Sequence, residues 1–424
     1  MTVNYRLSGY KLAVILIFFL FIFSIVTYFV LLQNASLDES VDTQAQISTV
    51  ALNSLSPAQT QTPRKIEILP DGSIVDSNPI TPLKRSGNAY TLSGDIVGSI
   101  DIMKSGITLD GAGYALRKSD GIDGGILVGI RYVNHREHGV NNVTIKNLQI
   151  TNTPYSLWLS GSNNIVTNVN ITGESGHGGS GIRACGSYNT IQNCHIVGTN
   201  GDGIFAEGDN TLIENNVITD NGEYGISFCN NPITLRSNIL NNNDRGPFRI
   251  YEDEKDASGQ PIKLKSGYID PTNLVEGKPV YYWINEHDKA VPSDAGYVYL
   301  DNCKNIVVEN IEIGWNSTNQ LYTGSTYAIN LIGSDNIVVK NNHLNETGIS
   351  CDSSNKNALI CNNTLTLGSI YTAGLSTTIL GNSIFQSKDV AIIVTGTDGT
   401  TVTQNVLINC DTGISLTPNS ASFW

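Results

Sequence analysis

The sequence predicts an all-β protein that winds as a right-handed parallel β-helix of about ten or more turns, behind one N-terminal transmembrane helix. Short segments of similar sequence recur about every 22 residues, and asparagine occupies a fixed phase of that repeat. Gly, Asn, Ser and Thr are abundant while only 15% of residues are charged, which is typical of many tight turns. A single uncharged run precedes the repeats.

That run, residues 12–32, reads LAVILIFFLFIFSIVTYFVLL and is long enough as a helix to cross a bilayer core of about 30 Å. A cleaved signal peptide is the alternative. The apolar core of a typical signal peptide spans only about 7–15 residues and is followed by a small-x-small cleavage site, whereas this run is longer and no good site of that kind follows it. Arg6 and Lys11 precede the run, so residues 1–11 are expected in the cytoplasm and the β-helix outside, at the cell surface. The protein is thus expected to be a single-pass protein of the cell membrane.

Residues 33–63 are rich in Ser, Thr, Gln and Ala without periodicity, which predicts a flexible stalk. Because Arg6 and Lys11 lie before the apolar run, the remaining 23 basic and 38 acidic residues give the rest of the chain a net charge of −15. Such a surface repels phosphates and excludes nucleic acid as a partner. Nothing in the sequence indicates an oligomeric state.

The repeats divide the rest of the chain. Residues 64–140 are expected to form an N-terminal cap and the first turns, 141–250 the β-helix, 251–301 an inserted loop or hairpin, and 302–424 the continued β-helix. Apolar residues alternate around the recurrent asparagine, as expected for strands that each meet a bend. Stacked amides inside the bends would satisfy unpaired backbone groups. The predicted asparagine ladder comprises Asn147, Asn168, Asn193, Asn215, Asn310, Asn341, Asn362, Asn382 and Asn405.

Three segments carry a family resemblance: GDIVGSIDIMKSGITLDGAGYAL at 94–116, GKPVYYW at 277–283 and VPSDAGYVYLDNCKNI at 291–306. With the asparagine-marked repeats, they resemble the NosD-type right-handed β-helix proteins over about residues 64–424. The resemblance implies the fold. It also implies two kinds of function: an accessory role in copper-site maturation of nitrous oxide reductase, or, from wider relatives, carbohydrate binding or sugar processing. Fold alone does not decide between them.

A second, strand-like motif in each turn places Trp158, Arg183, Phe205, Ser227 and Arg249 in one outward column. Aromatic rings stack on sugar faces, and Arg and carboxylates bind hydroxyls or uronates, so this column favours a saccharide-binding face. An ordinary solvent-exposed face is the alternative. The predicted substrate-binding residues are Trp158, Arg183, Asp202, Phe205, Glu207, Tyr224 and Arg249.

Catalytic motifs are weak. Asp202 and Glu207 share one turn, and glycoside hydrolysis needs two carboxyls about 5–9.5 Å apart. However, the Gly-His-Gly at 176–178 precedes Asn-Gly-Asp at 200–202, the reverse of the polygalacturonase order, and the double aspartate is missing. We therefore leave the catalytic residues unassigned, and expect no cofactor, with calcium only if the protein is a lyase.

Metal and thiol sites are not indicated either. His135 and His138 form an isolated H-x-x-H, and with only Met1 and Met103 a Met-rich copper(I) site is excluded. Seven scattered cysteines contain no C-x-x-C pair and are interpreted as small buried hydrophobes.

The sequence thus predicts a membrane-anchored surface protein that binds a polysaccharide or other glycan, as an adhesion or surface module. A polysaccharide lyase, hydrolase or epimerase, and a NosD-like factor for metalloenzyme maturation, remain the alternatives. Candidate glycosylation sites are Asn34, Asn316 and Asn345, whereas Asn362 is expected to point inward and stay unmodified.

Overall fold

A computed structural model describes residues 64–117, 125–133, 136–153, 156–173, 179–229, 232–251, 267–315, 327–396 and 398–417, with only the backbone at 130–133 and 136–138. All elements in these ranges are β-strands. The predicted span at 12–32 and stalk at 33–63 lie outside them. Within the described ranges, no helix is long and apolar enough to cross a membrane.

The first strands close the N-terminal end of the coil by antiparallel pairing. β1 (Arg64–Ile68) pairs with β2 (Ile74–Asp76), and β3 (Leu83–Ser86) pairs with β4 (Ala89–Leu92). On its other edge β1 pairs in parallel with β5 (Ile96–Ile102), so the hairpins lead into the first turn. These strands lie within residues 64–140, where a cap and the first turns were expected.

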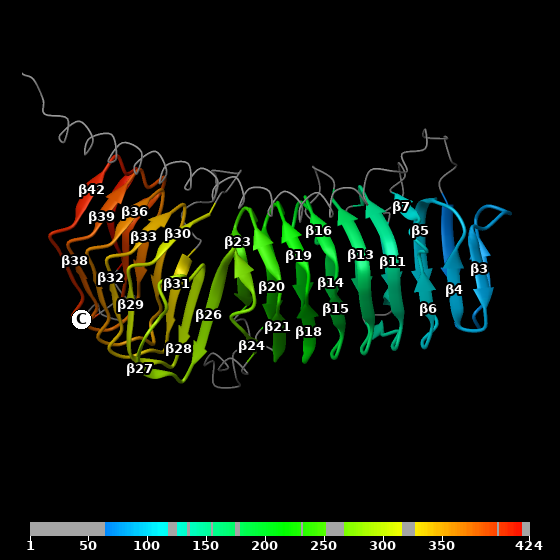
Figure 1. Ribbon diagram of the computed structural model, residues 1–424, viewed down its shortest axis with the longest axis horizontal. Helices are drawn as coiled ribbons and strands as arrows, with labels where there is room; N and C mark the ends of the chain where they lie inside the picture. Colours follow the sequence, from blue (N-terminus) through cyan, green and yellow to red (C-terminus); the bar gives the residue numbers. More distant parts are fainter. Residues whose placement is uncertain are drawn as a thin grey trace, which may run out of the picture. The chain divides into compact units, whose positions relative to one another are not determined.

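After the cap, strands from successive turns pair in parallel and lie side by side along the stack (Figure 1). One sheet carries the second motif of each turn. Its strands after β1 and β5 are β8 (Gly125–Val128), β12 (Leu157–Leu159), β14 (Ile182–Ala184), β17 (Ile204–Ala206), β20 (Tyr224–Cys229) and β23 (Gly246–Tyr251).

The asparagine-marked segments form the facing strands. The members are β6 (Thr108–Asp110), β7 (Ala115–Arg117), β11 (Thr144–Thr151), β13 (Ile165–Thr172), β15 (Thr190–Gln192), β16 (His195–Val197), β18 (Thr211–Glu214), β19 (Val217–Thr219), β21 (Ile233–Arg236), β22 (Ile239–Asn241), β24 (Tyr268–Ile269) and β25 (Leu274–Val275). A separate hairpin pairs β9 (Ile130–Val133) with β10 (Arg136–His138).

The segment 251–301, expected as an insertion on the solenoid, instead continues it where the structure describes it. β24 and β25 pair in parallel with β21 and β22, as one more turn. A hairpin does follow, because β25 pairs antiparallel with β26 (Lys278–Ile284). β26 then pairs in parallel with β28 (Tyr297–Asp301), so its run of aromatic residues belongs to the stack.

The C-terminal half stacks in three parallel series. The first continues β26 and β28 through β31 (Tyr327–Ile332), β34 (Gly348–Cys351), β37 (Ile370–Thr372), β40 (Val390–Thr395) and β43 (Thr412–Thr417). The second comprises β27 (His287–Ala290), β29 (Lys304–Glu309), β32 (Val338–Lys340), β35 (Leu359–Cys361), β38 (Thr378–Leu380) and β41 (Thr401–Thr403). The third comprises β30 (Glu312–Gly314), β33 (His343–Asn345), β36 (Thr364–Thr366), β39 (Ser383–Phe385) and β42 (Val406–Ile408).

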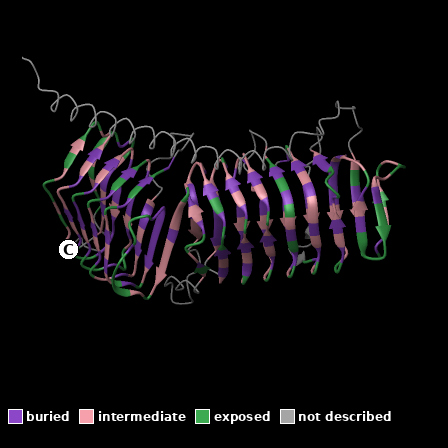
Figure 2. Ribbon diagram, viewed as in Figure 1, coloured by how far each residue is buried: buried purple, intermediate pink, exposed green. Residues whose placement is uncertain are grey.

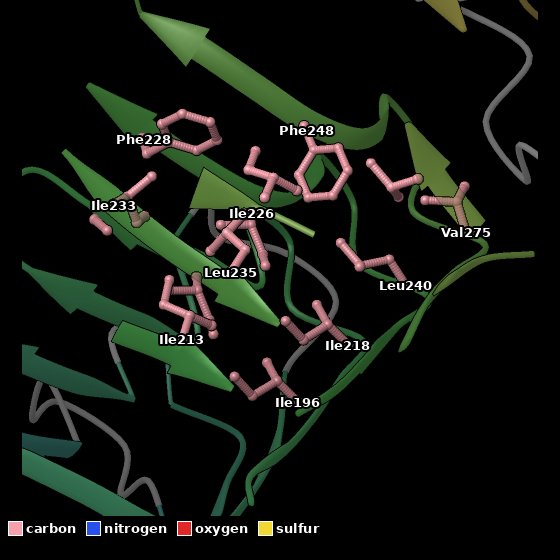
Figure 3. Packing of buried hydrophobic residues seen from close by; sticks show 14 of the residues in the cluster. Ile196, Ile213, Ile218, Ile226, Phe228, Ile233, Leu235, Leu240, Phe248 and Val275 are labelled. Carbon is pink, nitrogen blue, oxygen red and sulfur yellow. The ribbon is translucent and has the colours of Figure 1, made fainter. Parts of the chain in front are cut away.

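A core of stacked aliphatic side chains holds the turns together. Every second residue of a strand points inward, which produces the alternating buried and less buried bands in Figure 2. Ile182, Ile204 and Ile226 occupy one inward column and are fully buried, and Phe248 continues it. Figure 3 shows Ile226 and Phe248 in this packing. Each buried isoleucine stabilises the fold by about 1.5–3 kcal/mol.

The predicted asparagine ladder was off by one residue over most of its length. Seven of its nine members have a positive φ of 53–57° and occupy the left-handed bend, a conformation that Asn tolerates better than most residues. Asn147 is half-buried and the other six are exposed; these include Asn362, which is therefore not inward-facing. Only Asn382 and Asn405 belong to the inner ladder. The seven residues in the bends are Asn147, Asn168, Asn193, Asn215, Asn310, Asn341 and Asn362.

The inner ladder consists of the residue after each bend. Asn216 Nδ2 donates to Asn238 Oδ1 (3.0 Å), which in turn donates through its Nδ2 to Asn273 Oδ1 (2.9 Å). In the C-terminal half the same contact joins Asn342, Asn363, Asn382 and Asn405 at 2.9, 2.9 and 3.0 Å. The bends have a more modest amide contact of their own, from Asn168 Nδ2 to Asn147 Oδ1 (2.7 Å).

Candidate functional site

The outward column predicted from the second motif is present in the register expected. Trp158 pairs with Arg183, Arg183 with Phe205, Phe205 with Ser227 and Ser227 with Arg249, across β12, β14, β17, β20 and β23. These strands are short and alternate strictly, so apolar neighbours such as Leu157 and Leu159 point inward. Ser227 is fully buried and offers no surface.

Arg183 lies between two aromatic rings. Its guanidinium carbon is 4.7 Å from the centre of the Trp158 ring and 5.1 Å from that of Phe205. These distances match the spacing of about 4.8 Å between neighbouring strands, so flat groups at paired positions stack. Arg183 also forms an ion pair with Glu207 of the next turn. The predicted residues Trp158, Arg183, Phe205 and Glu207 are therefore in contact.

A second stack forms around Arg249. Its guanidinium carbon is 4.1 Å from the centre of the Tyr251 ring and 5.6 Å from that of Tyr224. Tyr251 also contacts Phe205, with ring centres 5.4 Å apart. The two stacks thus join into one row, Trp158, Arg183, Phe205, Tyr251, Arg249 and Tyr224, which we term the stacked ladder.

Tyr251 was not among the predicted binding residues, although it joins the two stacks. A signal for it exists in the sequence, because Tyr251 lies two residues beyond Arg249, as Glu207 lies two beyond Phe205. Positions two apart on a strand share a face. Cys229 pairs directly with Tyr251 on the neighbouring strand. The tyrosine therefore lies in a second outward column, two residues beyond the column that contains Phe205 and Arg249.

Asp202 and Glu207, the only carboxyls considered for catalysis within one turn, have different surroundings. Asp202 is 5% exposed and accepts a hydrogen bond from the Tyr224 amide at 3.1 Å. Burial, with a smaller contribution from Glu223, raises the pKa of Asp202 to about 6. Glu207 is partly exposed and bound by Arg183. The pKa of one carboxyl is thus raised towards neutral pH, and the other carboxyl is held in an ion pair.

The seven cysteines are all described and none forms a disulfide. Burial, followed by the neighbouring Glu207, raises the pKa of Cys185 to about 12, so its thiol is not activated. Within the described ranges, no group of three or more His, Cys, Asp or Glu is placed to hold a metal ion. The side chains of His135 and His138 fall outside what the structure describes, as do the glycosylation candidates Asn34 and Asn316. Asn345 is exposed on β33.

Comparison with known proteins supports the fold assignment. The family model described as "Right handed beta helix region" matches residues 105–258, and the one described as "Periplasmic copper-binding protein (NosD)" matches residues 249–423. No curated protein matches the chain in sequence.

Solved structures with a similar arrangement include three sugar-active proteins. The A-module of the mannuronan C-5 epimerase AlgE4 of Azotobacter vinelandii is 12% identical, with 76% of this chain and 90% of that one covered and a TM-score of 0.32. A PL6 alginate lyase in complex with a trisaccharide is 13% identical, covering 79% and 83%, with a TM-score of 0.33.

The tailspike protein of Escherichia coli bacteriophage HK620, in complex with a hexasaccharide, is 10% identical, covering 77% and 70%, with a TM-score of 0.36. At these values the likenesses add nothing to the case for a particular function. The two family matches do confirm the resemblance found in the sequence: residues 105–258 match the right-handed β-helix model and residues 249–423 match the NosD model.

Proposed function

We propose that the stacked ladder binds a polysaccharide or other glycan lengthwise. The observation that carries the proposal is the unbroken row of aromatic and guanidinium groups from Trp158 to Tyr224. At about 4.8 Å per strand, the four intervals from β12 to β23 span about 19 Å, the length of a few sugar units. Aromatic faces of this kind stack on the C–H faces of sugar rings.

The charge of the ladder favours a hydroxyl-rich ligand over a strongly acidic one. Glu207 already neutralises Arg183, so this pair offers donors and acceptors to hydroxyls without a net charge. Arg249 forms no ion pair within 4 Å among the described residues, so its charge is the one on the ladder that remains for an acidic group of a ligand. The net charge of −15 after the apolar run also slows the approach of a polyanion.

A glycan array with the full-length protein tests the proposal. Trp158→Ala should weaken binding by about tenfold at every salt concentration, because stacking is not screened as an ion pair is. Tyr268→Ala is the matched control, since Tyr268 is an aromatic residue exposed on β24, in another sheet. No glycan binding, or equal effects of the two substitutions, would contradict the proposal.

The protein's place is proposed on separate grounds. The NosD model is described as periplasmic, and the charges flanking residues 12–32 put the β-helix on the same side of the membrane as a periplasmic protein. We therefore propose an extracytoplasmic, membrane-anchored β-helix that presents the ladder for adhesion.

A polysaccharide lyase, hydrolase or epimerase is the second candidate function, and Asp202 favours it. A carboxyl with a pKa of about 6 transfers protons efficiently near neutral pH. After prolonged incubation of a bound glycan, mass spectrometry would reveal shortened or unsaturated products and proton NMR would reveal epimerised ones, and these should vanish in Asp202→Asn. Unchanged glycan would exclude this candidate for the sugar tested. For the maturation role, the described residues supply no observation.

A further inference from the structure

An open cleft of about 280 Å³ adjoins the end of the stacked ladder. Tyr224 and Arg249 of the ladder form part of its lining. The remaining lining residues lie on or next to β23, β28, β31 and β34, together with Trp315, which follows β30. The cleft therefore continues the surface to which the ladder leads.

Aromatic rings form the floor of the cleft. The ring centres of Phe248 and Tyr297 are 5.3 Å apart at 69°, and those of Tyr297 and Trp315 are 6.4 Å apart at 17°. All three residues are at least nine-tenths buried and also line the cleft. A floor of aromatic rings beneath a polar rim is the usual composition of a small-ligand site.

Trp315 has a buried donor without an acceptor. Its indole Nε1 is inaccessible to solvent and has no hydrogen-bond partner in the described part of the chain. The six-membered ring lies against Gly246, where a Cβ would stand 2.9 Å from Cζ3, so the N–H is on the opposite edge of the indole. Buried donors are rarely left unsatisfied, so a small shift of the indole towards an acceptor in the cleft would relieve this one.

The rim carries positive charge that the protein neutralises only in part. Arg245 Nη2 is 3.7 Å from Glu223 Oε1, whereas Arg249 stacks on aromatic rings and forms no ion pair within 4 Å among the described residues. Asp352, the carboxylate on the rim, accepts from the Ser354 hydroxyl (2.7 Å) and from the Gly333 amide (3.2 Å) within its own turn and the adjacent one. The guanidinium group of Arg249 therefore remains to attract an anionic group.

Asn330 adds a neutral polar group to the rim. Its Nδ2 donates to the Tyr297 hydroxyl (3.2 Å) and to the Tyr327 carbonyl (2.8 Å). Both hydrogen bonds use the amide NH2 group, which leaves Oδ1 to accept from a sugar hydroxyl.

We propose that this cleft binds a uronic acid residue of the glycan held on the stacked ladder. The sugar ring lies on the aromatic floor, a hydroxyl donates to Asn330 Oδ1, and the carboxylate faces Arg249. This inference rests on the proposed function, because Tyr224 and Arg249 belong to both surfaces. It adds a ligand chemistry that the ladder, with Arg183 already neutralised, does not require.

Fluorine NMR of the full-length protein labelled with fluorotryptophan separates the two surfaces, because Trp158 reports on the ladder and Trp315 on the cleft. The probes are trisaccharides of galacturonate, glucuronate and mannuronate, each compared with its methyl ester, and a panel of neutral oligosaccharides. We expect at least one uronate to move the Trp315 signal, and its ester to bind about tenfold or more weakly, since esterification removes a charge-assisted hydrogen bond.

A substitution that fills the cleft completes the test. Ser350→Phe, on an outward position of β34 that lines the cleft, should abolish the Trp315 response. Ser383→Phe, on a partly exposed position of β39, is the control and should leave it intact. If glycans move only the Trp158 signal, or if acid and ester bind equally, the cleft proposal is wrong and the ladder proposal stands. If no probe moves either signal, both are wrong.

Discussion

Replacing Asn216 by Ala should destabilise the coil far more than replacing its neighbour Asn215. Asn216 is fully buried; its Oδ1 accepts from the Cys194 amide (2.9 Å), and its Nδ2 donates to the Ile191 carbonyl (3.0 Å) and to Asn238 Oδ1 (3.0 Å). Alanine would leave the first two backbone groups buried without partners. At about 1–3 kcal/mol for each, the loss should be about 2–6 kcal/mol.

Asn215 is the matched control because it adjoins Asn216 but is exposed in the left-handed bend, with φ of 56°. Its replacement by Ala should cost about 1 kcal/mol, the penalty of that backbone conformation. Asn215→Gly should cost less still, since glycine adopts this bend freely. Urea unfolding followed by circular dichroism would measure the three changes through their midpoints. Equal losses for Asn215→Ala and Asn216→Ala would refute the assignment of the inner ladder.

Three other outcomes are expected. The pKa of Asp202 in the folded protein, about 6, exceeds its usual 3.8, so the stability that Asp202 contributes is fully present below pH 3.8 and is lost as the pH rises through 6. This pH dependence is worth up to about 3 kcal/mol. Asp202→Asn should remove it from unfolding curves measured between pH 4 and 7. Arg183→Met should lower glycan affinity about tenfold while changing stability by less than about 1 kcal/mol, whereas Arg236→Met, which breaks a comparable ion pair with Glu214 on another sheet, should leave affinity unchanged in the same titration. The full chain should resist carbonate extraction from membranes and a chain starting at residue 64 should not; release of both would show that residues 12–32 are no anchor.

The outward column was predictable because strand periodicity needs only local sequence. Once the second motifs are aligned, the two-residue periodicity of a β-strand determines which residues face outward. The pairing of Trp158 with Arg183 and of Arg183 with Phe205 then follows. The prediction of the asparagine column was wrong for a local reason as well. The left-handed bend and the inner ladder occupy adjacent positions and both favour Asn, so a doublet such as Asn215-Asn216 does not distinguish them.

A signal that separates the two positions was present in the C-terminal repeats. In the last two of these repeats the residue in the bend is Gly381 or Gln404, and asparagine remains only at the inner position, as Asn382 and Asn405. Glycine marks the left-handed position because it has no Cβ to clash. If Asn382 and Asn405 had been taken as the reference, the predicted ladder would have moved by one residue in all the remaining turns.

The cleft could not be predicted, because it depends on contacts between residues far apart in the sequence. Tyr297 contacts Phe248 and Trp315 contacts Tyr297, and both lie beyond a segment that looked like an interruption of the repeat. Its aromatic residues also have core-like burial, so sequence alone assigns them to packing.

Arginine serves the two surfaces differently, and its surroundings explain the difference. On the ladder, Glu207 cancels the charge of Arg183 while the stacked rings hold the guanidinium flat, which presents directed hydrogen-bond donors on a neutral site. At the cleft, Arg249 is held by rings alone. The acidic remainder of the chain acts on an approaching anion only within a Debye length of about 10 Å at 0.1 M salt. Close contact with Arg249 therefore decides whether an acidic sugar stays bound, even though the chain as a whole repels it.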